Sequence, residues 1–175
     1  MSSALAAALL AEPSSLPVRP VPRYFAVLLG TERVVQIRSS ATGQQVGRLA
    51  SPVGQFFSGV AETADGRRLL VAAQPDSACR TSLYWVSLDP AGQPGPLRPT
   101  SVKAVQGTLS SRALAMTPDG SVIAFSAYYC DGTGTVEILN LRTGSQAEWT
   151  TELSDDVESM ALSANGSVLS VSGTE

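Results

Sequence analysis

ALAMTPDGSVIAFSA, residues 113–127, is the stretch that decides the fold: two apolar strands joined by a tight polar turn that ends on glycine. The same pattern occurs as VAETADGRRLLVAA at residues 60–73 and as SMALSANGSVLSVS at residues 159–172. The turn glycines, Gly66, Gly120 and Gly166, lie 54 and then 46 positions apart. Several strands repeating at a period of roughly 40–50 residues are typical of β-propeller blades. The repeat therefore predicts an all-β propeller.

A second series of turns runs in phase with the first. Gly43, Gly92 and Gly144 each follow a strand of mixed polarity and lie 49 and then 52 positions apart. Glycine supplies the positive φ that tight hairpin turns require. Together the two series divide the chain into antiparallel blades of four strands, a to d, of which d is the outer strand that faces water.

Two blades are expected to be complete and two partial. The predicted strands a to d are Gly59–Thr63, Arg68–Gln74, Ser82–Leu88 and Gly95–Val102 in the second blade, and Arg112–Thr117, Val122–Tyr128, Thr135–Leu141 and Ala147–Glu152 in the third. The first blade has only strands b to d (Tyr24–Leu29, Arg33–Arg38, Gln45–Ala50), and the fourth only a and b (Val157–Ser163, Ser167–Ser172). The corresponding blade ranges are about 23–55, 56–106, 107–155 and 156–175, within a propeller region of 23–175.

The count of blades is low for a closed ring, because propellers usually have four to eight blades. An open arc exposes strand edges and apolar blade faces. We therefore expect this chain to be the N-terminal piece of a longer propeller. The alternative is that copies of the chain assemble to close the ring.

Residues 1–22 differ in composition and form a predicted extension or stalk. The apolar run of residues 4–11 is shorter than the about 20 residues that span a bilayer, and no positively charged segment precedes it. It is interpreted as a weak export signal, as the tail of a membrane helix whose beginning is missing, or as a plain N-terminal extension. Prolines at positions 13, 17, 20 and 22 then predict a stiff, extended linker.

Composition narrows the function classes. The chain has 175 residues, 43% hydrophobic and 15% charged, which predicts a folded protein. Its net charge of -3 argues against nucleic acid as a partner. It contains no histidine, which removes the commonest general base and the commonest zinc ligand. We predict no catalytic residue, no cofactor and no metal site.

The turns carry a family resemblance. Thr117-Pro118-Asp119-Gly120 and Thr63-Ala64-Asp65-Gly66, each before an apolar strand, resemble turns of bacterial WD40-like and TolB-like propellers. The Gly-His and Trp-Asp signatures of eukaryotic WD40 repeats are missing. Residues 79–88 together with 92–97 resemble uncharacterised actinobacterial-type propellers, in which a membrane helix and a Pro-rich stalk precede an extracytoplasmic propeller. The resemblance implies a location in the cell envelope or outside the cytoplasm, with the cytoplasm as the alternative, and it carries no established activity.

The two cysteines occupy corresponding places in successive blades. Cys79 and Cys130 each follow a b strand, and equivalent loops of neighbouring blades emerge on the same rim. A disulfide needs the two Cα atoms within about 7 Å of each other. The even number of cysteines, their matching positions and the stalk-like N-terminus predict a Cys79–Cys130 disulfide in an oxidising compartment. The alternative is two unrelated thiols, which the cytosol would keep reduced.

Candidate contacts gather on the loops of the same rim. Tyr128, Tyr129 and Asp131 flank Cys130, and Asp155 and Asp156 lie in the crossover before the fourth blade. The two aspartates with Glu158 could ligate calcium, but no calcium-loop spacing is present, and a solvated surface is the expected role. Asp131-Gly132-Thr133-Gly134 links two strands, which predicts a hairpin turn instead of a phosphate loop. For the tyrosines, packing against the loop is the expected role and contact with a sugar or peptide the alternative.

Three functions are compatible with these features. The favoured one is a non-catalytic binding or scaffold module outside the cytoplasm, whose rim loops contact a protein, peptide or glycan; its membrane contact would run only through a missing N-terminal anchor. Membership of an envelope complex, as for TolB-like propellers, is a special case of it. The alternative is part of a propeller enzyme, lactonase-like or quinone-dependent dehydrogenase-like, whose site lies in blades beyond this chain.

Overall fold

The computed structural model describes residues 21–29, 33–75, 79–149 and 157–173. Their regular structure consists of strands, which confirms the all-β class predicted by the repeat. The first sheet holds β1 (Tyr24–Leu29), β2 (Val34–Ser39) and β3 (Gln45–Ala50). The second holds β4 (Gln55–Glu62), β5 (Arg68–Pro75), β6 (Arg80–Ser87) and β7 (Arg98–Gln106). Within the described ranges no helix is long and apolar enough to cross a membrane.

The remaining strands form one complete and one partial sheet. The third sheet holds β8 (Thr108–Met116), β9 (Val122–Tyr128), β10 (Gly134–Asn140) and β11 (Gln146–Trp149). The last is the hairpin of β12 (Val157–Leu162) and β13 (Leu169–Gly173). Each strand pairs antiparallel with the next one along the chain inside its sheet. Two four-stranded blades and two partial blades are therefore present, as predicted.

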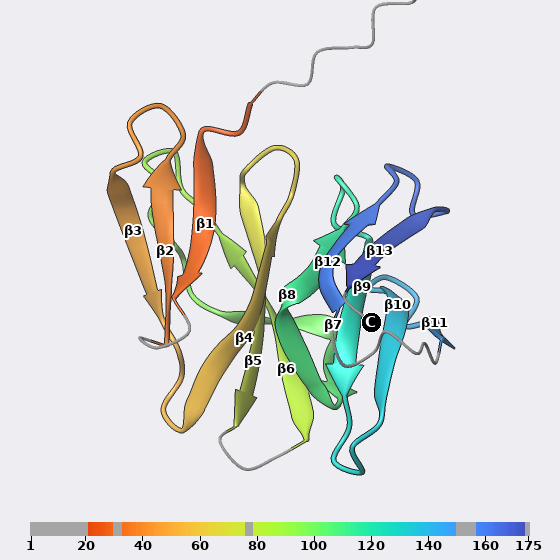
Figure 1. The fold of residues 1–175 in the computed structure, drawn as a ribbon. Helices are drawn as coiled ribbons and strands as arrows, with labels where there is room; N and C mark the ends of the chain where they lie inside the picture. Colours follow the sequence, from red (N-terminus) through yellow and green to blue (C-terminus); the bar gives the residue numbers. More distant parts are fainter. Residues whose placement is uncertain (1–20, 30–32, 76–78, 150–156, 174–175) are drawn as a thin grey trace, which may run out of the picture.

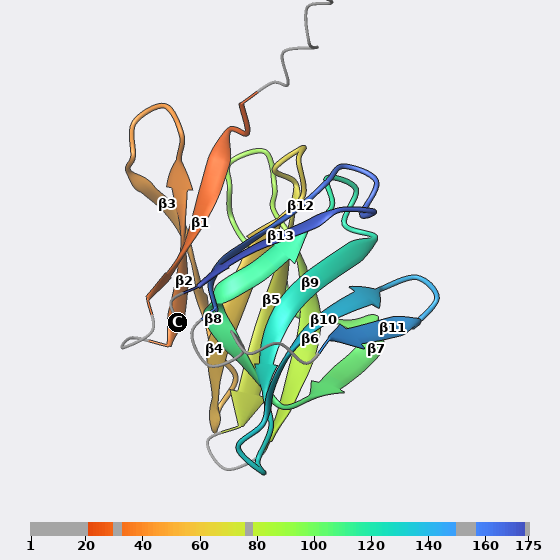
Figure 2. The ribbon, with the colours of Figure 1, turned by 45° about the vertical axis from the view of Figure 1, so that its right-hand side comes forward.

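The four sheets stand around an arc (Figures 1 and 2). The first strands of the last three sheets, β4, β8 and β12, lie side by side, and the other strands of each sheet follow outward from them. This arrangement is that of an incomplete β-propeller. We call the edge with the β4–β5, β8–β9 and β12–β13 turns the upper rim, because it is uppermost in Figure 1, and the edge with the β9–β10 turn the lower rim.

The second strand of each complete blade is buried on both faces. On β5, Leu69 and Val71 pack toward the first blade in a cluster with Ile37. Leu70, between them, points the opposite way and packs with Phe125 of the third blade. Successive side chains of a strand point to opposite faces, so a strand between two neighbours must be apolar at every position. This burial on both faces explains why the second strand of each complete blade is a continuous apolar run in the sequence.

The turns of the repeat share one set of hydrogen bonds. In the β8–β9 turn the Asp119 Oδ1 accepts from Thr117 Oγ1 (2.8 Å) and from the Ser121 amide (3.0 Å). The Val122 amide in turn donates to Thr117 Oγ1 (3.0 Å). The β4–β5 and β12–β13 turns repeat these bonds with Asp65 and Asn165 as the acceptors. The repeated sequence is therefore a repeated hydrogen-bonded turn.

Three predicted strands begin three or four residues away from their predicted starts. β4 and β8 start four residues before Gly59 and Arg112, where they were predicted to start, and one outer strand is displaced. The outer strand of the second blade runs over Arg98–Gln106 and not over Gly95–Val102. The chain between is held in a longer connection, in which Asp89 Oδ1 accepts from the amides of Ala91 and Gln93 (both 2.8 Å) and Leu88 forms an isolated bridge with Pro94. Since residues 1–20 lie outside the described ranges, the boundary expected between 22 and 23 stays a prediction.

Candidate binding sites at the two rims

A disulfide joins two blades at the lower rim. Cys79 lies just before β6 and Cys130 just after β9, and their Cα atoms are 5.7 Å apart. The bond spans 51 positions of sequence and ties the second blade to the third. The predicted disulfide is confirmed.

A cavity of about 610 Å³ opens beside this disulfide. Its polar wall comes from both blades: Gln106 ends β7, and Glu148 lies on β11. Its lining residues are Cys79, Gln106, Tyr129, Cys130, Asp131, Thr133 and Glu148. Three elements of the sequence prediction, the cysteines, Tyr129 and Asp131, thus meet in one place.

Behind this cavity lies a buried carboxylate. Glu137 on β10 is 1% exposed, and its Oε1 accepts from the Tyr129 hydroxyl at 2.6 Å. Its Oε2 accepts from the Gln146 side-chain amide. Burial raises the pKa of Glu137, and Glu148, its cross-strand neighbour, adds to the rise. Burial and the hydrogen bond to Glu137 together raise the pKa of Tyr129 to about 12, so this tyrosine is a hydrogen-bond donor at neutral pH.

The other predicted rim residues have distinct surroundings. The Tyr128 side chain is 45% exposed. Asp131 Oδ1 accepts from the amide and hydroxyl of Thr133 (2.9 and 2.6 Å), and Tyr129 and Thr133 close the turn through a backbone bond of 2.8 Å. The predicted β9–β10 hairpin turn is confirmed. Asp155 and Asp156 lie outside the described residues.

The two strand aromatics of the second blade pack inward. Tyr84 packs against the cluster shared with the first blade, and Trp85 against the cluster shared with the third. The Arg68 guanidinium lies 4.7 Å from the centroid of the Trp85 ring, a cation–π contact. Both side chains therefore stabilise the junctions between blades.

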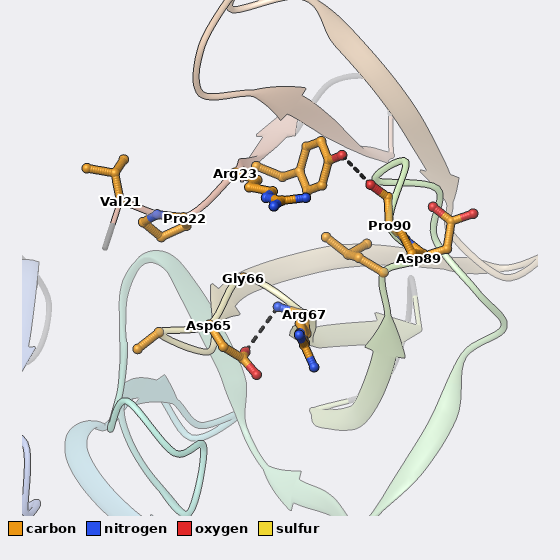
Figure 3. Close-up of a pocket in the computed structure, with 11 residues that line it drawn as sticks. Val21, Pro22, Arg23, Asp65, Gly66, Arg67, Asp89 and Pro90 are labelled. Atoms are coloured by element: carbon orange, nitrogen blue, oxygen red, sulfur yellow. Dashed lines mark hydrogen bonds between the residues drawn. The ribbon is translucent and has the colours of Figure 1, made fainter. Parts of the chain in front are cut away.

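A second cavity, of about 560 Å³, opens at the upper rim between the first and second blades. Arg23 and Arg67 are among its lining residues, with Arg23 above Arg67 in the view of Figure 3. The Tyr24 hydroxyl donates to the Pro90 carbonyl (2.7 Å) and ties the two blades together beside the cavity. The lining residues are Val21, Pro22, Arg23, Tyr24, Ala64, Asp65, Gly66, Arg67, Leu88, Asp89 and Pro90.

The turn aspartates have pKa values below the usual range. Side-chain and backbone donors of their own turns lower the pKa of Asp65 and Asp131. The same kind of bonds, led by the Ser121 amide, lower the pKa of Asp119 to about 2. Among the described residues, no three His, Cys, Asp or Glu side chains gather closely enough to hold a metal ion.

Sequence reasoning missed Glu137 and the upper cavity. Glu137 lies in a strand of mixed polarity, where a carboxylate is expected to face solvent, and in the structure the Tyr129, Thr135 and Gln146 side chains donate to it. The upper cavity combines three segments that are distant in sequence, one of which, Val21–Pro22, was assigned to the extension.

Comparison with solved structures places the fold among the β-propellers. The chain is similar to the β-propeller domain of Cps50 (Swd1) from Myceliophteria thermophila, with a TM-score of 0.56 and 18% identity over 87% of this chain and 45% of that domain. It is similar to TolB from Acinetobacter baumannii, with a TM-score of 0.54 and 17% identity over 85% of this chain and 34% of TolB.

A third similar structure is a functionally unknown protein from Desulfotomaculum acetoxidans, with a TM-score of 0.55 and 16% identity over 81% of this chain and 40% of that one. This chain thus spans less than half the length of these propellers. No protein-family model and no curated protein matches the sequence.

Proposed function

We propose that this chain is a non-catalytic binding module that acts outside the cytoplasm and contacts a protein partner through its lower rim. The observation that carries the proposal is the disulfide-braced cavity, where Cys79–Cys130 fixes the loops of two blades around Tyr129, Asp131 and Glu148. A covalent brace reduces the conformational entropy that these loops lose when a partner binds.

The chemistry of the rim supports binding over catalysis. Asp131 accepts two hydrogen bonds from its own turn, which lower its pKa and make it a weak base at neutral pH. Tyr128 adds an exposed aromatic surface next to the cavity, of the kind enriched where proteins bind one another.

A disulfide also supports a location in an oxidising compartment, the cell envelope or beyond. This part of the proposal is tested by trapping thiols with maleimide in intact cells that make the protein. We expect both cysteines to resist alkylation until a reductant is added. Free thiols in freshly trapped protein would contradict the location.

The binding role is tested by photo-crosslinking in the same cells. A photoreactive phenylalanine analogue replaces Tyr128, or Val168 in the control, which is 62% exposed in the β12–β13 turn of the upper rim. We expect one discrete protein adduct at position 128 that is lost in the Cys79→Ser/Cys130→Ser variant, and no such adduct at position 168. Equal adducts at both positions, or none at 128, would contradict a specific lower-rim contact.

A further inference from the structure

We propose that the upper-rim cavity is a second binding site, which takes a single carboxylate side chain carried by an extended peptide. This site lies on the rim opposite to the disulfide and is made of different residues, so it does not depend on the lower-rim function proposed above. Its residues come from the segment before β1, from the β4–β5 turn and from the connection after β6.

Two arginines provide the anion-binding element. Arg23 and Arg67 are both exposed and both line the cavity, and Figure 3 draws them with Arg23 above Arg67. Within the described part of the chain, neither guanidinium forms an ion pair. A guanidinium presents a planar set of N–H donors that matches a carboxylate. A carboxylate in the cavity would accept charge-assisted hydrogen bonds from these guanidinium groups, although the Arg67 charge also helps to lower the pKa of Asp65.

Two aspartates of the same cavity restrict what the ligand can be. The Oδ1 of Asp65 is occupied by Thr63 and by the Arg67 amide, and the Oδ1 of Asp89 by two turn amides. Their Oδ2 atoms accept no hydrogen bond from the described residues. The four ionised groups sum to zero charge, which disfavours a dianion such as phosphate. The free Oδ2 atoms instead suit N–H donors.

The site thus suits a ligand that carries one carboxylate with N–H donors on either side of it. An acidic residue in an extended peptide has this arrangement, and its neighbouring backbone amides would donate to Asp65 and Asp89. The apolar part of the wall suits the same ligand. Pro22, Leu88 and Pro90 line the cavity and offer surface to the aliphatic portion of a neighbouring side chain.

The walls of the cavity are already held in place. A Cβ placed on Gly66 would lie 3.2 Å from Pro22 Cβ, so the segment before β1 packs closely on the β4–β5 turn. On the other side the Tyr24 hydroxyl holds the Pro90 carbonyl at 2.7 Å. Because these contacts within the chain position the walls, binding would order few further groups.

The test is an NMR titration of the full, ¹⁵N-labelled chain with acetyl-Gly-Pro-Glu-Val-Gly-amide. We expect shifts of the amides of Gly66, Arg67 and Leu88 around the cavity. The matched peptide with Gln in place of Glu should bind at least about tenfold more weakly, the factor that one lost charge-assisted hydrogen bond represents.

Variants locate the site. Arg23→Gln and Arg67→Gln should each weaken the Glu peptide several-fold, whereas Arg142→Gln, at an exposed turn outside the cavity, should leave its affinity unchanged. The Glu peptide should lose affinity as salt rises, while the weak Gln peptide should not.

Three results would overturn the proposal: no shifts at these amides, equal affinity for the two peptides, or acetate and phosphate that bind as tightly as the Glu peptide, which would indicate a site for small anions only. The crosslink at position 128 reports on the other rim. Loss of peptide binding in Arg67→Gln with that crosslink intact would separate the two sites.

Discussion

Asp119, Asp65 and Asn165 occupy one structural position in three turns, although two are charged and one is neutral. What they share is an Oδ1 that accepts from a hydroxyl two residues before and an amide two residues after. The turn therefore requires a hydrogen-bond acceptor at this position, and a negative charge on that acceptor strengthens the bonds without being required. In Asp119 this strengthening is visible as the low pKa of about 2.

Asp119→Asn should therefore keep the turn, and Asp119→Ala should lose it at a cost of about 1 kcal/mol in the free energy of unfolding. Because the folded pKa of Asp119 is depressed, its charge stabilises the protein above the unfolded pKa of about 3.9 and this contribution disappears as the pH falls toward about 2. The difference in urea midpoint between wild type and Asp119→Asn should shrink over that window. A difference that stays constant from pH 6 to pH 2 would contradict the assignment.

Gly120 is required for two reasons that substitution can separate. Its φ is +74°, and a Cβ there would lie 2.9 Å from Trp85 Cη2 and 3.2 Å from Thr63 Cγ2. Gly132 has a φ of +85° but open space around its Cβ position. Gly132→Ala should therefore cost about 1–2 kcal/mol from backbone strain alone. Gly120→Ala should lower the stability further than Gly132→Ala, because Trp85 must also repack around the new methyl group. Thermal unfolding measures both losses. Equal losses would show that Trp85 moves aside at no cost.

At the scale of the element, the sequence predicted the bounds of buried and of half-exposed strands correctly, with Tyr24–Leu29 and Gln45–Ala50 among the latter. The strand Val122–Tyr128 was predicted with both ends correct, because an apolar run between two glycine turns leaves few alternatives. The outer strand Arg98–Gln106 was predicted about three residues early, because the Asp89 hydrogen bonds and the Leu88–Pro94 bridge lengthen the connection before it. Such bonds depend on the geometry of single side chains, which the hydrophobic periodicity of the sequence does not predict.

The two-sided burial of β5 makes a sharp prediction. Leu69 and Leu70 are both 0% exposed but belong to different junctions. Leu69→Ala and Leu70→Ala should each lower the free energy of unfolding by about 2–5 kcal/mol. Val53→Ala, at a fully exposed side chain (103%), serves as the control and should stay within about 0.5 kcal/mol of wild type. A small effect of either leucine would show that its junction does not contribute to the measured transition.

The disulfide should stabilise the two complete blades against unfolding. Its loop of 51 positions corresponds to at most about 4 kcal/mol on the chain-entropy model. We expect Cys79→Ser/Cys130→Ser to unfold at lower urea concentration, and the reduced wild type to match it. A reductant should leave the double variant unchanged. A reduced wild type as stable as the oxidised one would contradict the expected contribution.

For the whole molecule, the protection of backbone amides against hydrogen exchange is expected to rise toward the middle of the arc. β5 and β9 are hydrogen-bonded on both edges, whereas among the strands that the structure describes β1 pairs only with β2 and β13 only with β12. The side chains of β1 are half-buried or exposed, while most of those on β5 are fully buried.

Amide hydrogen exchange should accordingly be slowest in β5 and β9 and faster in β1 and β13. Mass spectrometry of peptic fragments resolves these strands. Uniform protection across the described strands would contradict the expected gradient, and would indicate that β1 and β13 have partners in solution.

The alternation along β5 has a consequence for cooperativity. Because Leu69 belongs to one junction and Leu70 to the next, the described sheets form a row in which each apolar cluster joins two neighbouring sheets. In such a row stability is a sum over links, and fraying can begin at one end and pass along sheet by sheet. The Cys79–Cys130 bond joins the second and third sheets of this row, and we expect fraying from either end to stop at that junction.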